Sequence, residues 1–108
     1  MSLLNRYVEH LAAGDAEKVS LLFAVDGIFY DEGPVKMNME PVTIKGREGI
    51  RAFFQQVFSA QGPIVASNVC INGNAMRYDV GVGDLQIMAL GLLREEEGLI
   101  KEYRVTVI

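Results

Sequence analysis

The chain has 108 residues, of which half are hydrophobic and 22% are charged. This balance is ordinary for one globular domain and argues against an intrinsically disordered chain. The net charge of −4, with scattered lysines and arginines, argues against a nucleic-acid-binding protein, which needs a clustered basic face, and against attachment to an anionic membrane.

The first third of the sequence predicts two helices and a short strand. Residues 2–13 carry apolar side chains at helical spacing, and Gly14 is a suitable end for this helix. Asp15 can cap a second helix that runs to about residue 25. Residues 28–31, Ile-Phe-Tyr-Asp, then have the composition of a strand.

A mixed segment and the clearest helix follow. Residues 32–45 alternate apolar and polar side chains, but Pro34 and Pro41 limit regular pairing, so we expect a loop or an extended flap. Gly46 opens a helix that ends at residues 61–63. The apolar positions of this helix fall on one face, at Ile50, Phe53, Phe54, Val57 and Phe58.

From residue 64 onward the hydrophobic period becomes two, which predicts strands. Asn72-Gly73 is a strong hairpin signal between the first two of them. Helices gathered before an antiparallel sheet predict an α+β domain spanning residues 1–108, with the helices on one face and a cavity between the two layers. The four expected strands cover residues 64–71, 75–82, 85–93 and 99–108.

Cys70 is the single cysteine, so no internal disulfide can form, and its apolar strand pattern predicts a buried core thiol. Histidines, cysteines and carboxylates do not cluster at ligand spacing, so we expect no metal and no cofactor. The N-terminus has no secretory-signal pattern and no apolar stretch has membrane-spanning length, so we expect a cytoplasmic location.

Three motifs follow one another, in residues 6–15, 24–31 and 46–54, and a polar hairpin turn follows at 96–100. With these motifs the sequence resembles the ketosteroid-isomerase-like superfamily, which includes the SnoaL-like polyketide cyclases and shares the fold of nuclear transport factor 2. The resemblance covers about residue 4 to the C-terminus. It implies a cone-shaped, curved antiparallel or mixed sheet wrapped around N-terminal helices, as in cystatin-like folds. It also implies a pocket for a small apolar molecule and a homodimer formed through the exposed sheet face.

The resemblance implies two catalytic residues. In ketosteroid isomerases a tyrosine on the first helix hydrogen-bonds the developing oxyanion, and an aspartate on the first strand moves the proton; Tyr7 and Asp31 stand at these positions. Leu90 stands where those enzymes keep a protonated aspartic acid, and Phe54 where they have a supporting tyrosine. Loss of one oxyanion donor typically costs about 10²–10³ in rate. The alternative is therefore a non-catalytic ligand-binding or dimerisation domain.

Each of these two residues also has a purely structural interpretation. Asp31 precedes Glu32-Gly33-Pro34 and is an exposed turn residue if its side of the strand faces solvent. It shares a face with Phe29, and if that face lines the cavity, burial raises the pKa of its carboxyl. Tyr7 lies on an apolar stripe, so it is either a core tyrosine or an oxyanion donor.

Strand alternation predicts the other pocket walls but does not decide which row faces inward. If one row lines the pocket, the opposite row (Ile87, Ala89, Val105 and Val107) leaves an apolar outer face suited to a partner. Met37 and Met39 of the flap cover the pocket mouth or else pack on the sheet or at a subunit contact. The predicted lining residues are Phe29, Phe54, Met76, Tyr78, Met88 and Leu90.

Overall fold

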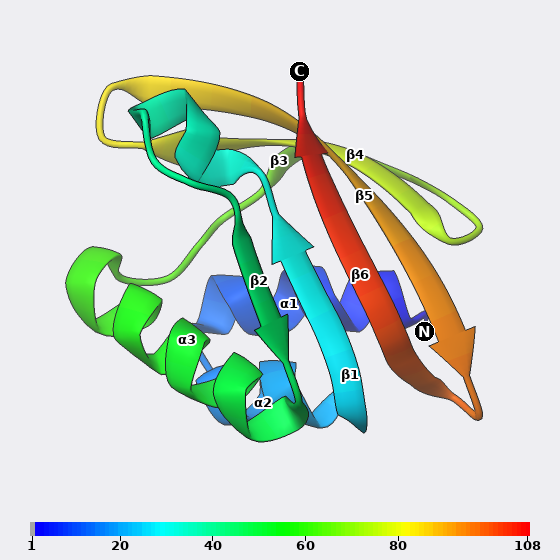
Figure 1. The fold of residues 1–108 in the computed structure, drawn as a ribbon. Coiled ribbons are helices and arrows are strands. Elements are labelled where there is room, and N and C mark those ends of the chain that lie inside the picture. The colour runs from blue at the N-terminus through cyan, green and yellow to red at the C-terminus, as the bar shows by residue number, and fades with distance from the viewer. Residues whose placement is uncertain (1) are drawn as a thin grey trace.

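The computed structural model describes residues 2–108, and the described chain begins with two capped helices (Figure 1). Helix α1 spans Leu3–Ala13; the Ser2 hydroxyl accepts the Asn5 N–H at 3.2 Å, and Gly14 ends the helix in the left-handed region. Helix α2 spans Ala16–Leu21, and its Asp15 cap accepts the Lys18 N–H at 3.0 Å. Both predicted helices are present because each has its side-chain cap and an apolar face.

Strand β1 begins earlier than the sequence predicts. It spans Phe23–Asp31, so helix α2 ends at Leu21 rather than near residue 25. Phe23 is fully buried and pairs with Ile100 of the last strand, β6 (Leu99–Val107), and this pairing sets the start of β1. The pairing is irregular between Phe23 and Ile28, and Gly27 lies inside this irregularity. A Cβ at Gly27 would come within 2.9 Å of the Ile100 carbonyl oxygen, so this close approach requires glycine.

The predicted flap contains regular structure. A 3₁₀ turn covers Gly33–Met37, and strand β2, Val42–Lys45, pairs antiparallel with β1. The expectation of a loop or extended flap is therefore wrong for β2, which is an edge strand. The prolines did not prevent the pairing, because both lie outside Val42–Lys45.

Helix α3 spans Arg47–Gln61 and packs on β1 and α2. The Arg47 guanidinium donates two hydrogen bonds to the Phe23 carbonyl, from Nε at 3.0 Å and from Nη2 at 2.7 Å. This contact satisfies a carbonyl that the irregular start of β1 leaves free, and it ties α3 to the sheet. Ile50 and Phe54 of the helix are buried in the core.

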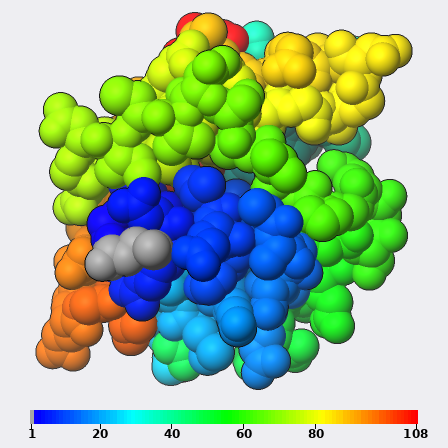
Figure 2. All heavy atoms as spheres, turned by 180° about the vertical axis from the view of Figure 1, so that it is seen from behind, coloured from blue at the N-terminus to red at the C-terminus, as the bar shows by residue number. Residues whose placement is uncertain are grey.

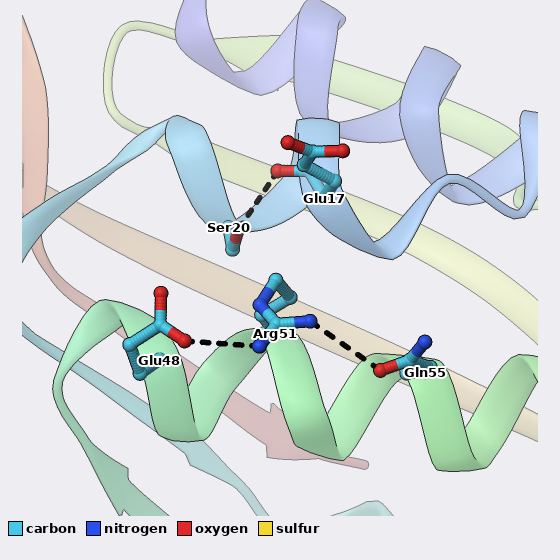
Figure 3. Close-up of polar contacts among 5 residues, drawn as sticks. All are labelled: Glu17, Ser20, Glu48, Arg51 and Gln55. Carbon is cyan, nitrogen blue, oxygen red and sulfur yellow. Dashed lines mark hydrogen bonds and ion pairs between the residues drawn. The ribbon is translucent and has the colours of Figure 1, made fainter.

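Figure 3 shows polar contacts where α2 and α3 lie opposite each other. Arg51 of α3 pairs with Glu48 at 2.9 Å and donates to Gln55 at 3.5 Å. Ser20 is buried in α2, and its hydroxyl donates to the Glu17 carbonyl at 2.7 Å. The buried hydroxyl is thereby satisfied, and the exposed ion pair contributes little stability.

The six strands within residues 2–108 form one sheet in the order β2-β1-β6-β5-β4-β3. All neighbours are antiparallel except β1 and β6, which are parallel. The predicted mixed, curved sheet with helices on one side is confirmed: β3 and β4 bend away from β1 and β6, and the three helices lie on the inner side (Figure 1). The last four strands span Ser67–Asn72 (β3), Ala75–Val82 (β4), Leu85–Glu96 (β5) and Leu99–Val107 (β6).

The core lies between the inner sheet face and the helices and is rich in aromatic rings. Phe29 of β1 contacts Phe54 of α3 and Tyr103 of β6, with ring centroids at 5.1 and 6.3 Å. Seen from behind, α1 lies between α3 on one side and the β3–β4 hairpin on the other (Figure 2). None of the helices in residues 2–108 has the length and apolarity needed to cross a membrane.

Candidate functional site

A cavity of about 600 Å³ lies between the inner sheet face, α1, α3 and the 3₁₀ turn. This volume is within the range of small-molecule sites, which are typically about 300–1,000 Å³. Most of its walls are apolar, with contributions from α3, β4, β5 and β6. The apolar walls include Phe53, Phe54, Val57, Val80, Ile87, Ala89, Val105 and Val107.

Asp31 ends β1 at the cavity wall and is mostly buried. Its Oδ1 accepts the Gly33 N–H at 2.8 Å, which holds the carboxylate in a tight turn. Burial raises the pKa of the Asp31 carboxyl above its ordinary value; the Gly33 N–H lowers this pKa, and Glu32 raises it. A carboxylate in such a site is a stronger base than an exposed one.

Tyr7 extends from α1 to the same cavity and is 3% exposed. Its ring lies between Tyr103, at a centroid distance of 4.9 Å, and Phe54, at 6.3 Å. Burial raises the pKa of the Tyr7 hydroxyl well above its ordinary value, and Tyr78 and Asp31 raise it further. The hydroxyl therefore keeps its proton at neutral pH and can act as a hydrogen-bond donor.

Tyr78 of β4 is a second tyrosine of the cavity wall, and it is buried. It pairs directly with Ala89 of β5, whose small side chain leaves the ring room on the inner face. Burial raises the pKa of Tyr78; Tyr103 lowers this pKa and Asp31 raises it. Asp31, Tyr7 and Tyr78 are thus three polar groups in the lining of one cavity.

Tyr103 of β6 is a residue that the sequence did not single out. It is fully buried, and its hydroxyl oxygen has no hydrogen-bond partner of normal geometry within residues 2–108. Burial raises the pKa of Tyr103 well above its ordinary value, as do Tyr78 and Tyr7. The available signal was Gly91 on the neighbouring strand, because a glycine within a strand often marks a close approach by another group.

The predictions for Met88 and Leu90 are wrong, because the row that contains them faces away from the helices. The row considered as an apolar outer face, Ile87, Ala89, Val105 and Val107, instead lines the cavity, whereas Met88 is 39% exposed. Leu90 therefore does not stand at the cavity position where ketosteroid isomerases keep a protonated aspartic acid. Its inner neighbours, Ala89 and Gly91, also have no side-chain donor, so β5 supplies none to the cavity.

The other predicted lining residues divide into two groups. Phe29 and Phe54 line the cavity beside Asp31 and Tyr7. Met76 is on the inner face, as the alternation indicated, but it is 1% exposed and packs in the core outside the cavity lining. The flap methionines, Met37 and Met39, both border the cavity, and Met39 is exposed.

The outer sheet face carries a polar network and a thiol. Arg77 and Asp79 of β4 form an ion pair at 3.6 Å, and the Asn68 amide donates to Asp79 at 2.8 Å. Cys70 pairs with Arg77 and is exposed, so the prediction of a buried thiol is wrong. It lies on β3, an edge strand whose residues are mostly exposed, because the helices do not cover it.

Comparison with known proteins agrees with the fold. The sequence profile of the SnoaL-like domain family matches residues 4–103. Curated protein sequences give no match to this chain. Within residues 2–108 the structure has no group of three or more histidines, cysteines or carboxylates placed to hold a metal ion.

Three solved structures illustrate the shared fold. A protein from Sphaerobacter thermophilus is 14% identical with a TM-score of 0.77, and the match covers 98% of this chain and 93% of that one. A candidate ketosteroid isomerase from Kribbella flavida is 17% identical with a TM-score of 0.71, covering 98% and 75%. A candidate polyketide cyclase from Sinorhizobium meliloti is 16% identical with a TM-score of 0.70, covering 96% and 93%. At these identities the similarity demonstrates the fold alone.

Proposed function

Because this chain belongs to the SnoaL-like domain family, we propose that it is an isomerase- or cyclase-like protein that moves a proton on a small apolar carbonyl compound. The observation that carries the proposal is the presence of Asp31 and Tyr7 in one largely apolar cavity of about 600 Å³. The carboxylate is a base and the hydroxyl is a donor, which are the two groups that enolisation requires.

In the proposed reaction Asp31 takes a proton from the carbon next to the substrate carbonyl. The electron pair of the broken C–H bond moves toward the carbonyl oxygen, which becomes an enolate. Tyr7 donates a hydrogen bond to this oxygen, and its raised pKa keeps the proton on the tyrosine. Asp31 then returns the proton to the same carbon or to a conjugated one. In a cyclase the enolate carbon instead attacks a second carbonyl of the same molecule; the π bond of that carbonyl breaks, and its oxygen takes the proton from Asp31.

The experiment is proton exchange in deuterated water with a panel of small cyclic ketones, followed by NMR. We expect the protein to accelerate exchange at the α carbon and Asp31→Asn to slow it at least about 100-fold, since a positioned base typically contributes 10²–10⁴. The matched control is Asp26→Asn, because Asp26 lies outside the cavity in an ion pair with Lys101. Equal exchange by Asp31→Asn and the unmodified protein would contradict the proposed mechanism.

A second part of the proposal is a homodimer formed through the outer sheet face. Met88 and Leu92 are 39% and 50% exposed there, on the row that faces away from the helices. Exposed apolar side chains in one row of a sheet face support a protein partner. A cytoplasmic location, expected from the sequence, stays a prediction alongside the dimer.

The alternative function is a non-catalytic domain that binds a small apolar ligand or serves dimerisation. The lack of any side-chain donor at Ala89 and Gly91 favours it, because the late-strand acid of ketosteroid isomerases has no counterpart there. The exchange experiment separates the two functions. A ligand that binds in the cavity of a protein that accelerates no exchange would support the alternative.

A further inference from the structure

Two tyrosines line the cavity, and a third tyrosine from another element packs against one of them. Tyr7 comes from α1, Tyr78 from β4 and Tyr103 from β6. The rings of Tyr7 and Tyr103 are in contact, with centroids 4.9 Å apart, and Tyr7 and Tyr78 both border the cavity. Asp31 borders the same cavity from β1. The wall is therefore richer in hydroxyl donors than the proposed reaction with Tyr7 alone requires.

A carbonyl oxygen or an enolate oxygen has room for two hydrogen bonds. The family resemblance indicated donor positions on α1, on α3 and on a late strand. Phe54 on α3 has no donor group, and the inner row of β5 has none either, so Tyr7 is the single donor among these positions. Tyr78 is the tyrosine of β4 that faces the cavity, directly across from Ala89.

We propose that Tyr78 is the second oxyanion donor of this site, so that Tyr7 and Tyr78 together bind one substrate oxygen opposite Asp31. The inference rests on the proposed function, because it describes how the same site holds the oxygen.

Tyr103 is a positioning residue in this arrangement. Its ring packs against Tyr7, and its hydroxyl is buried at Gly91, so it cannot reach solvent. The Tyr103 hydroxyl also interacts with the Tyr78 hydroxyl, because this contact raises the pKa of Tyr103 and lowers that of Tyr78, as expected when Tyr103 donates toward Tyr78. Tyr103 therefore positions Tyr7 through ring packing and Tyr78 through its hydroxyl.

The test uses 4-nitrophenol, whose ionised form absorbs visibly, and the Asp31→Asn protein as the parent. The amide stands in for the protonated carboxyl, and no negative charge repels the phenolate. We expect Tyr7→Phe and Tyr78→Phe each to weaken phenolate binding about 10- to 100-fold, the usual effect of losing one hydrogen bond to a charged group. Tyr30→Phe is the matched control, since the Tyr30 hydroxyl donates to Glu32 at 2.9 Å and Tyr30 does not line the cavity.

A measurement on the parent protein keeps the inference testable if Tyr78→Phe does not fold. The chain has four tyrosines, so labelling the ring carbon that bears the hydroxyl gives four NMR signals. Adding 4-nitrophenol should shift the signals of Tyr7 and Tyr78 strongly and leave that of Tyr30 unchanged.

The outcomes separate the inference from the function on which it rests. Weakened binding by both cavity variants, with Tyr30→Phe unchanged, supports Tyr78 as the second donor. Binding that depends on Tyr7 and not on Tyr78 overturns the inference and leaves the proposed function intact. No phenolate binding by the parent, or binding independent of Tyr7 as well, overturns both.

Discussion

The Tyr103 hydroxyl of β6 occupies the space directly over Gly91 of β5. A Cβ at position 91 would lie 2.0 Å from the Tyr103 hydroxyl oxygen and 2.5 Å from the ring carbon that bears it. The Tyr103 ring can lie at this position because residue 91 has no side chain, and the same ring packs against Tyr7. A residue without a side chain thus shapes the wall of the cavity that contains the proposed donors.

Gly91→Ala should destabilise the protein by about 1–3 kcal/mol, the usual effect of overpacking a core. The fully buried Tyr103 ring must move toward the cavity to avoid the new methyl group. Gly81→Ala is the control, because the nearest atom to a Cβ there is the end of the flexible Gln86 side chain, at 3.2 Å. Denaturant unfolding of both variants checks the prediction, and equal stability of the two would contradict it.

Asp31→Asn should stabilise the protein at neutral pH. Burial raises the pKa of Asp31 in the folded state, so the folded protein holds this proton more tightly than the unfolded chain does. The stability that this proton contributes is complete below the unfolded pKa of about 3.9 and is lost as pH rises through the higher folded pKa. The neutral amide avoids that loss and can still accept the Gly33 N–H.

Unfolding experiments at neutral pH and near pH 3 test this pH dependence. The gain from Asp31→Asn should shrink at the lower pH, where the carboxyl is protonated in both states. A gain that is the same at both values, or a loss at neutral pH, would mean that burial does not govern this carboxyl.

Much of the fold follows from local pattern, and the errors have physical causes. Helices α1 and α3 have long periodic faces, and the hairpins have turn residues that few other conformations accept. The start of β1 was misplaced because Val19, Leu22 and Phe23 also fit one helical face. The pairing of Phe23 with Ile100 makes this segment a strand. The two residues are far apart in the sequence, so no local pattern can indicate the pairing.

The candidate site was predictable only in part for a related reason. Strand β5 is apolar on both faces, so alternation cannot say whether Met88 or Ala89 faces inward. The packing of Tyr78 and Tyr103 against the small residues Ala89 and Gly91 decides it. The motif resemblance indicated Asp31 and Tyr7. The position of Tyr103 beside the cavity depends on its packing over Gly91, which is known only once the strands are paired.

Tyr7→Phe should lower kcat about 10²–10³-fold on any ketone found to be a substrate, with a smaller change in KM. The hydroxyl contributes most when charge develops on the substrate oxygen, so its loss affects the transition state more than binding. Steady-state kinetics measure both constants, with Tyr30→Phe as the control. A rise in KM at unchanged kcat would instead mean that Tyr7 only helps to bind the ground state.

Leu92→Glu should convert the proposed homodimer into a monomer. Leu92 is 50% exposed on the outer sheet face, and a buried unpaired carboxylate at an interface is strongly unfavourable. Light scattering measures the mass of both proteins. Leu21→Glu is the control, since Leu21 is equally exposed, at 52%, but lies on α2. A monomeric unmodified protein would contradict the dimer directly.

The central claim is that Asp31 is a partly buried base facing an oxyanion site. The measurement that tests it most directly is an NMR titration of the Asp31 carboxyl carbon, with and without a phenolic oxyanion mimic such as equilenin. We predict a midpoint above the ordinary value of about 3.9 for aspartate, and a further rise when the mimic is bound, because the nearby oxyanion disfavours a second negative charge. A midpoint at the ordinary value, unchanged by a mimic that does not bind, would contradict the claim and identify Asp31 as a structural turn residue.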